Sequence, residues 1–255
     1  MKKLIALTVA VISLVGCDPT NNNNTTTTTT TTNDTYTIVT GVENGYAGKC
    51  EGCLLDAKRM KEILSPYSKT LTYLTDKNAN RQAVVNALTE GVKHNLCIFF
   101  HSGHGGSVKT YTDKTEVDGH DEYLCLYDKE LLDNDIWNII KNAKGRVFLM
   151  FDCCHSGTMF RAPVTFIRQR MKLSATSTVS ASVDILCWSG CPDDTYSYGG
   201  SDGGEFTNAI RKYFKSTLTY NELWSKVEAD SSLKKYEQVQ RTIIGKNFGN
   251  TKIFK

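Results

Sequence analysis

The sequence has little of what marks a specialised class of protein. Its 255 residues include only 4 Pro and 19 Gly, too few for a collagen-like chain. Hydrophobic residues make up 40% and charged residues 22%, which excludes a wholly disordered chain. Nine cysteines in 255 residues are too sparse for a small disulfide scaffold, and no internal repeat is present. The composition is that of an ordinary globular domain.

No apolar run is long enough to cross a membrane comfortably, since a span needs ~20 apolar residues. The one extended run, over residues 4–15, follows Lys2 and Lys3 and ends at Gly16-Cys17, as in a secretory signal. The segment 14–17 resembles the lipobox of bacterial lipoproteins. That resemblance implies a signal peptide over residues 1–16, cleavage before Cys17 and lipidation of Cys17. The alternative is a plain signal peptide followed by an incidental cysteine.

Residues 17–34 follow as an Asn- and Thr-rich tract that cannot bury apolar surface, and we expect a flexible linker there. We therefore expect an exported, membrane-anchored lipoprotein, periplasmic or on the cell surface. The chain carries 30 Lys and Arg against 27 Asp and Glu, and loss of Lys2 and Lys3 brings it still closer to neutral. A near-neutral body without a basic run predicts no nucleic-acid partner.

Hydrophobic patterning from Tyr36 onward predicts strands that alternate with helices. Such alternation indicates an α/β fold, with a mainly parallel sheet covered by helices on both sides. We expect a hairpin or loop over the polar stretch 107–121 and an edge strand over 123–127. We expect an exposed loop over 161–182. The expected strands of the sheet are 36–40, 71–74, 97–100, 147–151 and 183–188, and the expected helices are 53–64, 81–93, 134–141, 205–215 and, closing the chain, 220–229.

Two of the wholly apolar strands end in unusual segments. His-Ser-Gly-His-Gly-Gly follows Phe100, and Asp-Cys-Cys-His-Ser-Gly follows Phe151. The carboxyl ends of strands in an open α/β sheet form the ligand crevice, so paired strands would bring a histidine and a cysteine together. A nearby imidazole raises the thiolate fraction of a cysteine, and glycines let backbone N–H groups approach a reacting carbonyl.

These two blocks resemble those of the caspase/metacaspase (clan CD, peptidase C14) cysteine peptidases, in the metacaspase or bacterial caspase-like branch. His104 and Cys154 are 50 residues apart, the spacing typical of caspases. Shorter matching segments lie at 52–57, 118–122, 189–194 and 204–207. The resemblance implies a caspase-like three-layer αβα sandwich over residues 35–255 and a cysteine-type endopeptidase that acts on peptides or proteins, which we expect to be a monomer.

The resemblance also implies roles for individual residues. Cys154 would be the nucleophile and His104 the general acid/base, with the backbone N–H groups of Gly105 and Cys154 as the oxyanion hole. We expect Cys153 to pack in the core. His101 and His155 are expected to be structural.

Metacaspase-like enzymes cleave after Arg or Lys, which implies an acidic S1 site. The matching positions are Asp56 and Asp152, with Ser102 and Cys53 nearby; Asp193 or Asp194 would stand at its rim. A guanidinium and a buried carboxylate form a strong charge-assisted pair. The alternative for Asp56 is that it only caps or solvates the first helix.

The resemblance implies a calcium site in many family members, with Asp121 and Asp133 at two matching positions. Asn134 stands where a second adjacent Asp is common, and Arg161 where Asp is frequent. Because a cation repels Ca²⁺ and an amide supplies less charge than a carboxylate, we expect no cofactor to be required and any calcium binding to be weak.

Other functions fit parts of the sequence. His101, His104, Cys153, Cys154 and His155 are candidate zinc ligands. Cys50 and Cys53 form a Cys-x-x-Cys pair that indicates a redox module, a surface disulfide or two unrelated thiols. A third alternative is a noncatalytic caspase-like (pseudoenzyme) binding lipoprotein.

The remaining cysteines and the basic loop carry two further expectations. We expect Cys97, Cys125, Cys153 and Cys187 to pack as small hydrophobic groups, whereas Cys50, Cys53 and Cys191 stand where a disulfide is possible. The basic residues of 161–172 indicate a site of self-cleavage, given the expected preference for Arg and Lys.

Overall fold

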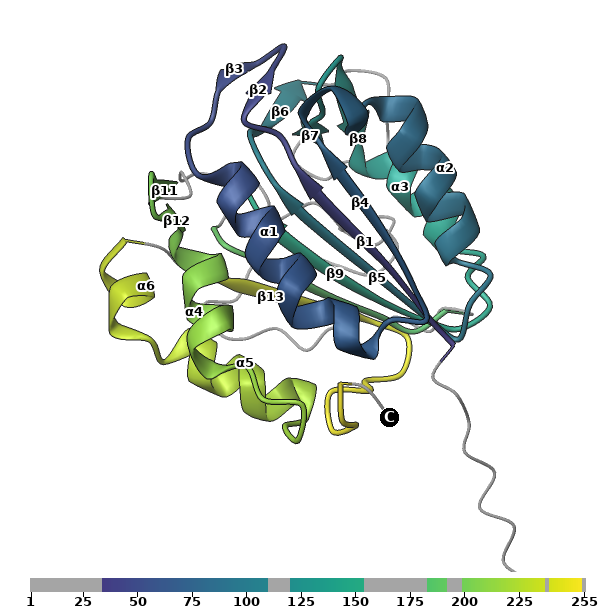
Figure 1. Cartoon of the computed structure of the whole chain (residues 1–255). Coiled ribbons are helices and arrows are strands. Elements are labelled where there is room, and N and C mark those ends of the chain that lie inside the picture. The colour runs from purple at the N-terminus through teal and green to yellow at the C-terminus, as the bar shows by residue number, and fades with distance from the viewer. Residues whose placement is uncertain (1–33, 110–119, 154–182, 192–198, 237–238, 254–255) are drawn as a thin grey trace, which may run out of the picture. The chain divides into compact units, whose positions relative to one another are not determined.

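A six-stranded sheet lies at the centre of the computed structural model, which describes residues 34–109, 120–153, 183–191, 199–236 and 239–253 (Figure 1). Its strand order is β13-β10-β9-β5-β1-β4, and all neighbouring strands are parallel except β10 and β13. The bounds are β1 Thr35–Gly41, β4 Thr70–Thr75, β5 Leu96–Ser102, β9 Arg146–Asp152, β10 Ile185–Ser189 and β13 Gln240–Ile244.

The two central strands β5 and β9 are apolar on both faces. Along β5, Phe99 packs into one hydrophobic cluster, whereas Ile98 and Phe100 pack into the other. Strand β9 alternates in the same way between its odd- and even-numbered residues from Val147 to Phe151. Continuous apolar strands are typical of a parallel sheet covered on both sides. The expectation of strands buried on both faces is confirmed.

Helices form the two outer layers. Helix α1 (Cys53–Leu64), α4 (Glu205–Tyr213) and α5 (Tyr220–Glu228) pack on one face, and α2 (Arg81–Gly91) and α3 (Asp133–Ile140) on the other (Figure 1). Asn80 is the N-cap of α2, and its side chain accepts a hydrogen bond from the Ala83 N–H. Thr219 and Glu222 form a capping box at the start of α5. The three-layer αβα sandwich is confirmed.

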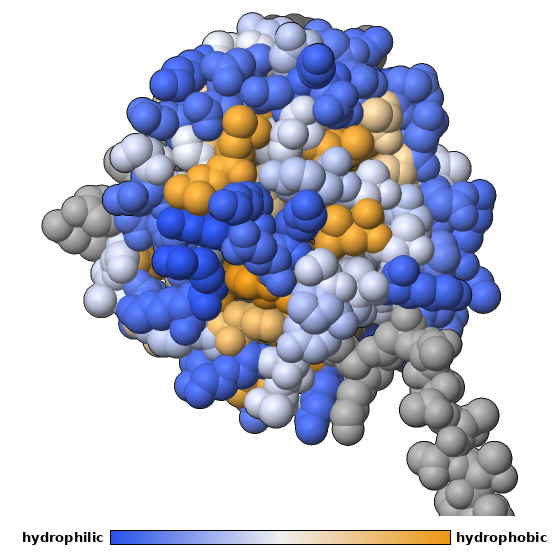
Figure 2. Space-filling view, in the orientation of Figure 1, coloured by the Kyte–Doolittle hydropathy of each residue, from blue (hydrophilic) through white to orange (hydrophobic). Residues whose placement is uncertain are grey.

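The outer surface of the layer with α1, α4 and α5 is mainly polar. Figure 2 shows that hydrophilic side chains dominate this face and that hydrophobic residues emerge between them as separate patches. On the other side of these helices, Phe148 packs edge-on against Trp188 and Tyr220, with ring centroids 4.8 and 4.9 Å away. Within the described ranges, no helix is long and apolar enough to cross a membrane.

A second, three-stranded antiparallel sheet follows β5. It consists of β6 (Gly105–Lys109), β7 (His120–Cys125) and β8 (Glu130–Leu132), in the order β6-β7-β8. The hairpin expected over 107–121 is confirmed by β6 and β7. The expected edge strand 123–127 is wrong, because the strand begins three residues earlier and lies between two others. Short hairpins β2 (Asn44–Gly45) and β3 (Gly48–Lys49), and β11 (Gly199–Gly200) and β12 (Gly203–Gly204), complete the set of strands.

The prediction that helices close the chain is also wrong. After α5 come α6 (Ser231–Tyr236) and the antiparallel edge strand β13. The β13 residues Ile243 and Ile244 are buried, whereas the first three are only partly so. Two adjacent buried residues show no clear alternation, which explains why the sequence pattern missed this strand.

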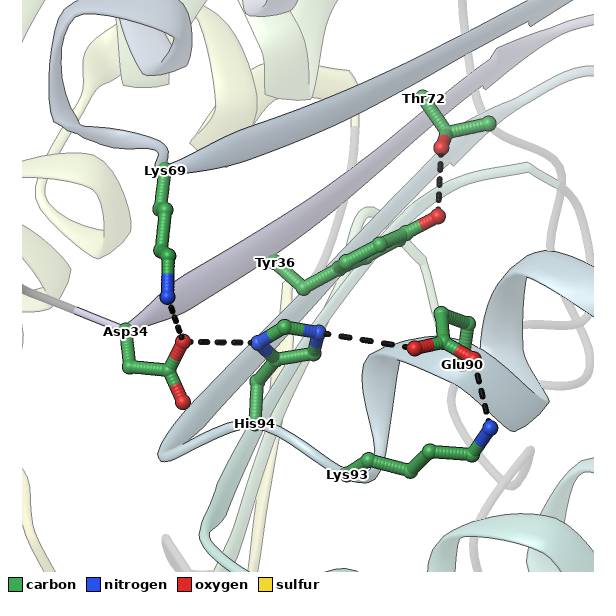
Figure 3. A network of polar contacts seen from close by, with 7 residues as sticks. All are labelled: Asp34, Tyr36, Lys69, Thr72, Glu90, Lys93 and His94. Atoms are coloured by element: carbon green, nitrogen blue, oxygen red, sulfur yellow. Dashed lines mark hydrogen bonds and ion pairs between the residues drawn. The ribbon is translucent and has the colours of Figure 1, made fainter. Parts of the chain in front are cut away.

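A polar network holds the first described residue to the amino-terminal edge of the sheet (Figure 3). Asp34 Oδ1 accepts hydrogen bonds from Lys69 Nζ at 3.1 Å and pairs with His94 Nδ1 at 2.9 Å. The second ring nitrogen of His94 lies 4.0 Å from Glu90. These contacts join the chain before β1 to the start of β4 and to the turn after α2. They also hold the pKa of Asp34 down at about 2.

Candidate active site

Strands β5 and β9 pair directly and end side by side. Their register places Ser102 opposite Asp152, and the Gly103 N–H continues the pairing with a 3.4 Å hydrogen bond to the Asp152 carbonyl. His104 follows the end of β5 by two residues. In sequence, Cys154 follows the end of β9 by the same number. Cys154 itself lies outside the described residues.

Main-chain contacts on both sides fix His104. Its carbonyl accepts a 2.9 Å hydrogen bond from the Cys125 N–H, and its ring Nε2 lies 3.1 Å from the Lys49 carbonyl oxygen. A carbonyl only accepts, so this contact requires a proton on Nε2, and in the neutral ring Nδ1 then keeps the lone pair. Gly105, the expected oxyanion-hole residue, begins β6 directly afterwards, opposite Leu124. In this tautomer, Nδ1 is the hydrogen-bond acceptor of the ring.

His101 lies three residues earlier but in a different environment. It is fully buried, and its Nδ1 is 2.9 Å from the Thr40 hydroxyl. Burial lowers the pKa of His101 to about 4, so the ring is neutral at ordinary pH. A buried neutral ring held in the core agrees with the structural role expected for His101.

The described residues of the zinc alternative do not form a ligand set. His101 contacts Thr40 in the core, whereas His104 contacts the Lys49 carbonyl in β3. Cys153 is buried. Cys154 and His155 lie outside the described residues. Among the side chains that the structure describes, no group of three or more His, Cys, Asp or Glu could hold a metal ion.

Two buried carboxylates lie at the same edge of the sheet. Asp56 in α1 is 1% exposed, and Asp152 at the end of β9 is 5% exposed. Asp56 Oδ2 accepts 2.9 Å hydrogen bonds from the Ser102 hydroxyl and from the Gly204 N–H. Asp56, Ser102 and Asp152 are therefore brought together as the sequence predicted. We call Cys53, Asp56, Ser102 and Asp152 the acidic cluster.

The start of α4 holds the second carboxylate. Asp152 Oδ2 accepts hydrogen bonds from the Thr207 N–H at 2.9 Å and from the Thr207 hydroxyl at 2.6 Å. Gly204 lies between the two acids, and a Cβ there would collide with the Asp152 carboxylate. Residues 204–207 matched the family pattern in sequence, but nothing in that match indicated that they would hold both carboxylates.

The surroundings of Asp56 disfavour its ionised form, although the nearby Arg59 acts in the opposite direction. Burial, and then repulsion from Asp152, raise the pKa of Asp56 to about 8. Its Oδ1 is buried and has no hydrogen-bond partner among the described residues. A buried acceptor without a partner is costly, and a buried anion more so. The alternative that Asp56 only caps the helix leaves Oδ1 unexplained.

Among the described residues, those expected to bind calcium lie together, and hydrogen-bond donors face their carboxylate oxygens. Asp121 and Asp133 are both buried. The Asn134 side-chain amide donates a 2.8 Å hydrogen bond to Asp121 Oδ1, and the Asn134 N–H donates one of 2.6 Å to Asp133 Oδ1. Ca²⁺ takes six to eight oxygen ligands. Donors facing these oxygens do not fit that requirement, and Arg161 lies outside the described residues.

The cysteines divide as expected in the core. Cys97, Cys125, Cys153 and Cys187 are all buried, which confirms that they pack as small hydrophobic groups. Cys191 is buried too, and its thiol donates to the Cys153 carbonyl at 3.3 Å. Cys53, a member of the acidic cluster, lies next to Cys50, with the two sulfur atoms 2.8 Å apart and no disulfide between them.

Comparison with known proteins agrees with this arrangement. The profile of the Peptidase_C14 caspase domain matches residues 33–248. The chain therefore belongs to the caspase-domain family of peptidases, and the predicted family membership is confirmed. A solved structure of a Geobacter sulfurreducens protein has the same fold, with a TM-score of 0.66 and 22% identity over 86% of this chain and 98% of that one.

Curated relatives include three metacaspases. Metacaspase-1 of Cryptococcus neoformans is 25% identical over 243 residues, covering 69% of this chain and 53% of its own length. Metacaspase-1 of Pyricularia oryzae is 25% identical, covering 72% of this chain and 64% of its own length. Metacaspase-5 of Trypanosoma cruzi is 25% identical, covering 76% of this chain and 53% of its own length. The chain thus spans about half to two thirds of the length of these relatives.

Proposed function

We propose that the protein is a cysteine endopeptidase that cleaves peptide bonds after Arg or Lys, with Cys154 as nucleophile and His104 as general acid/base. The observation that carries this proposal is the direct pairing of β5 and β9, with Ser102 opposite Asp152. The strand that leads to His104 and the strand that leads to Cys154 end at the same edge, beside the acidic cluster. The caspase-domain match supports the same chemistry.

The reaction follows from the state of the His104 ring. With Nε2–H donated to the Lys49 carbonyl, Nδ1 takes the proton of the Cys154 thiol. The thiolate attacks the scissile carbonyl, and the N–H groups of Gly105 and Cys154 stabilise the oxyanion. The imidazolium then protonates the leaving amine. Water, deprotonated by the same nitrogen, hydrolyses the thioester and releases the acid product.

Recognition of the basic side chain rests on the acidic cluster. A guanidinium entering it would meet Asp56 Oδ1, which has no hydrogen-bond partner among the described residues. Its positive charge would offset the repulsion between Asp56 and Asp152, which raises the Asp56 pKa. Buried acids held by Ser102, Gly204 and Thr207 are prepared for this contact before substrate arrives.

Peptidase assays test this proposal. Fluorogenic peptides with Arg, Lys or Asp before the scissile bond are compared on wild type, Cys154→Ala and His104→Ala. We expect turnover of the Arg and Lys peptides by wild type only. Cys153→Ala is the matched control, because Cys153 is the adjacent thiol and is buried in the core. Turnover of no basic peptide by folded protein would favour the noncatalytic binding protein, and cleavage after Asp would refute the basic specificity.

We also propose that activity requires no calcium. The support is the Asn134 amide, which donates to Asp121 where a cation would need a free oxygen. Turnover of the Arg peptide should be unchanged by a chelator and by added Ca²⁺. Loss of activity with the chelator, restored by Ca²⁺ alone, would overturn this proposal.

Anchoring of the protein through Cys17 is a further part of the proposed function. Its support is the sequence pattern of residues 1–34, which lie outside the described residues except for Asp34. Expression of wild type and Cys17→Ser in a bacterial host with a labelled fatty acid tests it. We expect label and membrane fractionation for wild type only. Equal release of both proteins into the soluble fraction would indicate a plain signal peptide.

A further inference from the structure

A tight turn joins β3 to α1 and has a cysteine at each end. The Cys53 N–H donates to the Cys50 carbonyl at 3.5 Å, which closes a four-residue turn over Cys50-Glu51-Gly52-Cys53. Gly52 has φ +90° and ψ −12°, the values required at the third position of a type II turn. A Cβ on Gly52 would also collide with the β11 and β12 backbone. Only glycine fits at position 52, and the turn is therefore fixed in shape.

This turn places two thiols in contact. The Cys50 and Cys53 sulfur atoms are 2.8 Å apart. A disulfide has an S–S length of about 2.05 Å and spans Cα separations of roughly 4.4–6.8 Å. The first and fourth Cα atoms of a β-turn lie within about 7 Å, so the backbone needs little movement to accept the bond. Both cysteines are in the thiol form.

The two thiols differ in exposure and in acidity. Cys50 is partly exposed, whereas Cys53 is only 4% exposed. The hydrogen bond from the Cys53 thiol holds the pKa of Cys50 below its usual value, against burial and nearby carboxylates. The same contact, together with burial, raises the pKa of Cys53. Cys50 is thus the more accessible of the two thiols and the one whose thiolate is favoured.

We propose that Cys50 and Cys53 are a redox site, which a small-molecule disulfide such as oxidised glutathione converts reversibly into an intramolecular disulfide. The Cys50 thiolate attacks one sulfur of the oxidant and releases one glutathione thiolate. The Cys53 thiol then loses its proton, attacks the Cys50 sulfur and releases the second glutathione. The protein gives up two electrons and two thiol protons, and the oxidant becomes two thiols.

The Cys50–Cys53 pair lies next to residues of the candidate active site. Lys49, the residue before Cys50, provides the carbonyl that contacts His104 Nε2, and Cys53 begins the helix that carries Asp56. The disulfide would tie these two segments to each other. The bond itself does not depend on peptidase activity, so its test is independent of the proposed function.

Mass spectrometry of the full chain tests the proposal in a Cys154→Ala background, which removes the nucleophile as a competing thiol. Protein is equilibrated in reduced or oxidised glutathione buffers, quenched with N-ethylmaleimide under denaturing conditions and digested with trypsin. Both cysteines fall in one expected tryptic peptide, 50–58, between Lys49 and Lys58. We expect this peptide to carry two maleimides after reduction. After oxidation it should carry none and be lighter than the dithiol peptide by two hydrogen atoms.

Single substitutions test the order of attack. Cys53→Ser should leave Cys50 as a mixed disulfide with glutathione, because the resolving thiol is missing. Cys50→Ser should leave Cys53 unmodified until the protein is denatured. Two maleimides on the wild-type peptide in oxidised buffer would overturn the proposal, as would a disulfide from Cys50 to a different cysteine. Glutathione on Cys53 in the Cys50→Ser protein would overturn the assigned order.

Discussion

Replacement of Asp56 by Asn should raise stability and lower activity at the same time. In the free protein, the pKa of Asp56 rises from 3.8 to about 8, mainly through burial and the charge of Asp152. That rise corresponds to a cost on the order of 5 kcal/mol for the ionised form. An asparagine keeps an oxygen for the Ser102 and Gly204 hydrogen bonds and removes the charge. We therefore expect the variant to be more stable at high pH.

The sign of this effect depends on pH. A carboxyl whose folded-state pKa is raised contributes stability below its ordinary pKa, and that stability is lost as the pH rises through the folded-state value. For Asp56 the window runs from 3.8 to about 8. Urea unfolding should show little difference between wild type and Asp56→Asn at pH 4. At pH 9 the variant should be more stable by about 2 kcal/mol or more, a part of the full cost above.

Catalysis should change in the opposite direction. Loss of a buried charge partner costs about 2–5 kcal/mol, or roughly 30- to 5,000-fold in kcat/KM for an Arg peptide. A peptide with citrulline, the neutral isostere of arginine, should be affected little. The ratio of the two kcat/KM values therefore reports on the charge alone. Asp135→Asn is the matched control, since Asp135 is a surface acid paired with Arg81 and should change neither quantity appreciably.

Binding of a guanidinium should also depend on pH. Below about pH 8 the free carboxyl of Asp56 holds a proton that must leave when the cation binds. The affinity of Cys154→Ala for an arginine-based ligand, measured by calorimetry, should rise up to about tenfold per pH unit between pH 6 and 8 and then level off. An affinity that is flat over this range, or an unchanged Arg-to-citrulline ratio in Asp56→Asn, would refute the reasoning.

Three further outcomes are expected. Wild type incubated alone should lose intact mass through cuts after basic residues of 161–172, and Cys154→Ala should not; identical intact masses would contradict self-processing. Phe148→Ala should lower the free energy of unfolding in urea by about 3–5 kcal/mol, because the ring packs against two buried aromatics; a loss below 1 kcal/mol would contradict that packing. Asp34→Asn should lower the melting temperature at pH 7, and the difference should vanish as the pH falls from 3.8 toward 2, because the folded-state pKa of Asp34 is about 2; an equal difference at both ends would refute its ionic role.

Much of the fold could be predicted because its signals are local. Helix α1 has the bounds that the apolar spacing of 53–64 gave, and β9 contains the whole apolar run 147–151. Strand β13 could not be predicted, because its buried residues do not alternate, and the central place of β7 could not, because a residue pattern does not specify which strands pair.

The candidate site also could be predicted only in part. Two strand ends with histidine, cysteine and glycine indicated where the chemistry lies, and the register of β5 and β9 agrees. The Lys49 carbonyl that contacts His104 was not predictable, since a main-chain oxygen has no signature in sequence. Thr207 lies 55 residues from Asp152, and no local pattern links the two.

The polar network at Asp34 determines at which end of the sheet the chain before Asp34 joins the domain. The chain before Asp34 meets the sheet at the amino end of β1, whereas the acidic cluster lies past the carboxyl ends of the strands. Strand β1 has seven residues, a length of about 23 Å. The chain that precedes Asp34 therefore joins the domain about 23 Å, the length of β1, from the end of the sheet where the acidic cluster lies, so an attachment before Asp34 would not need to cover that end.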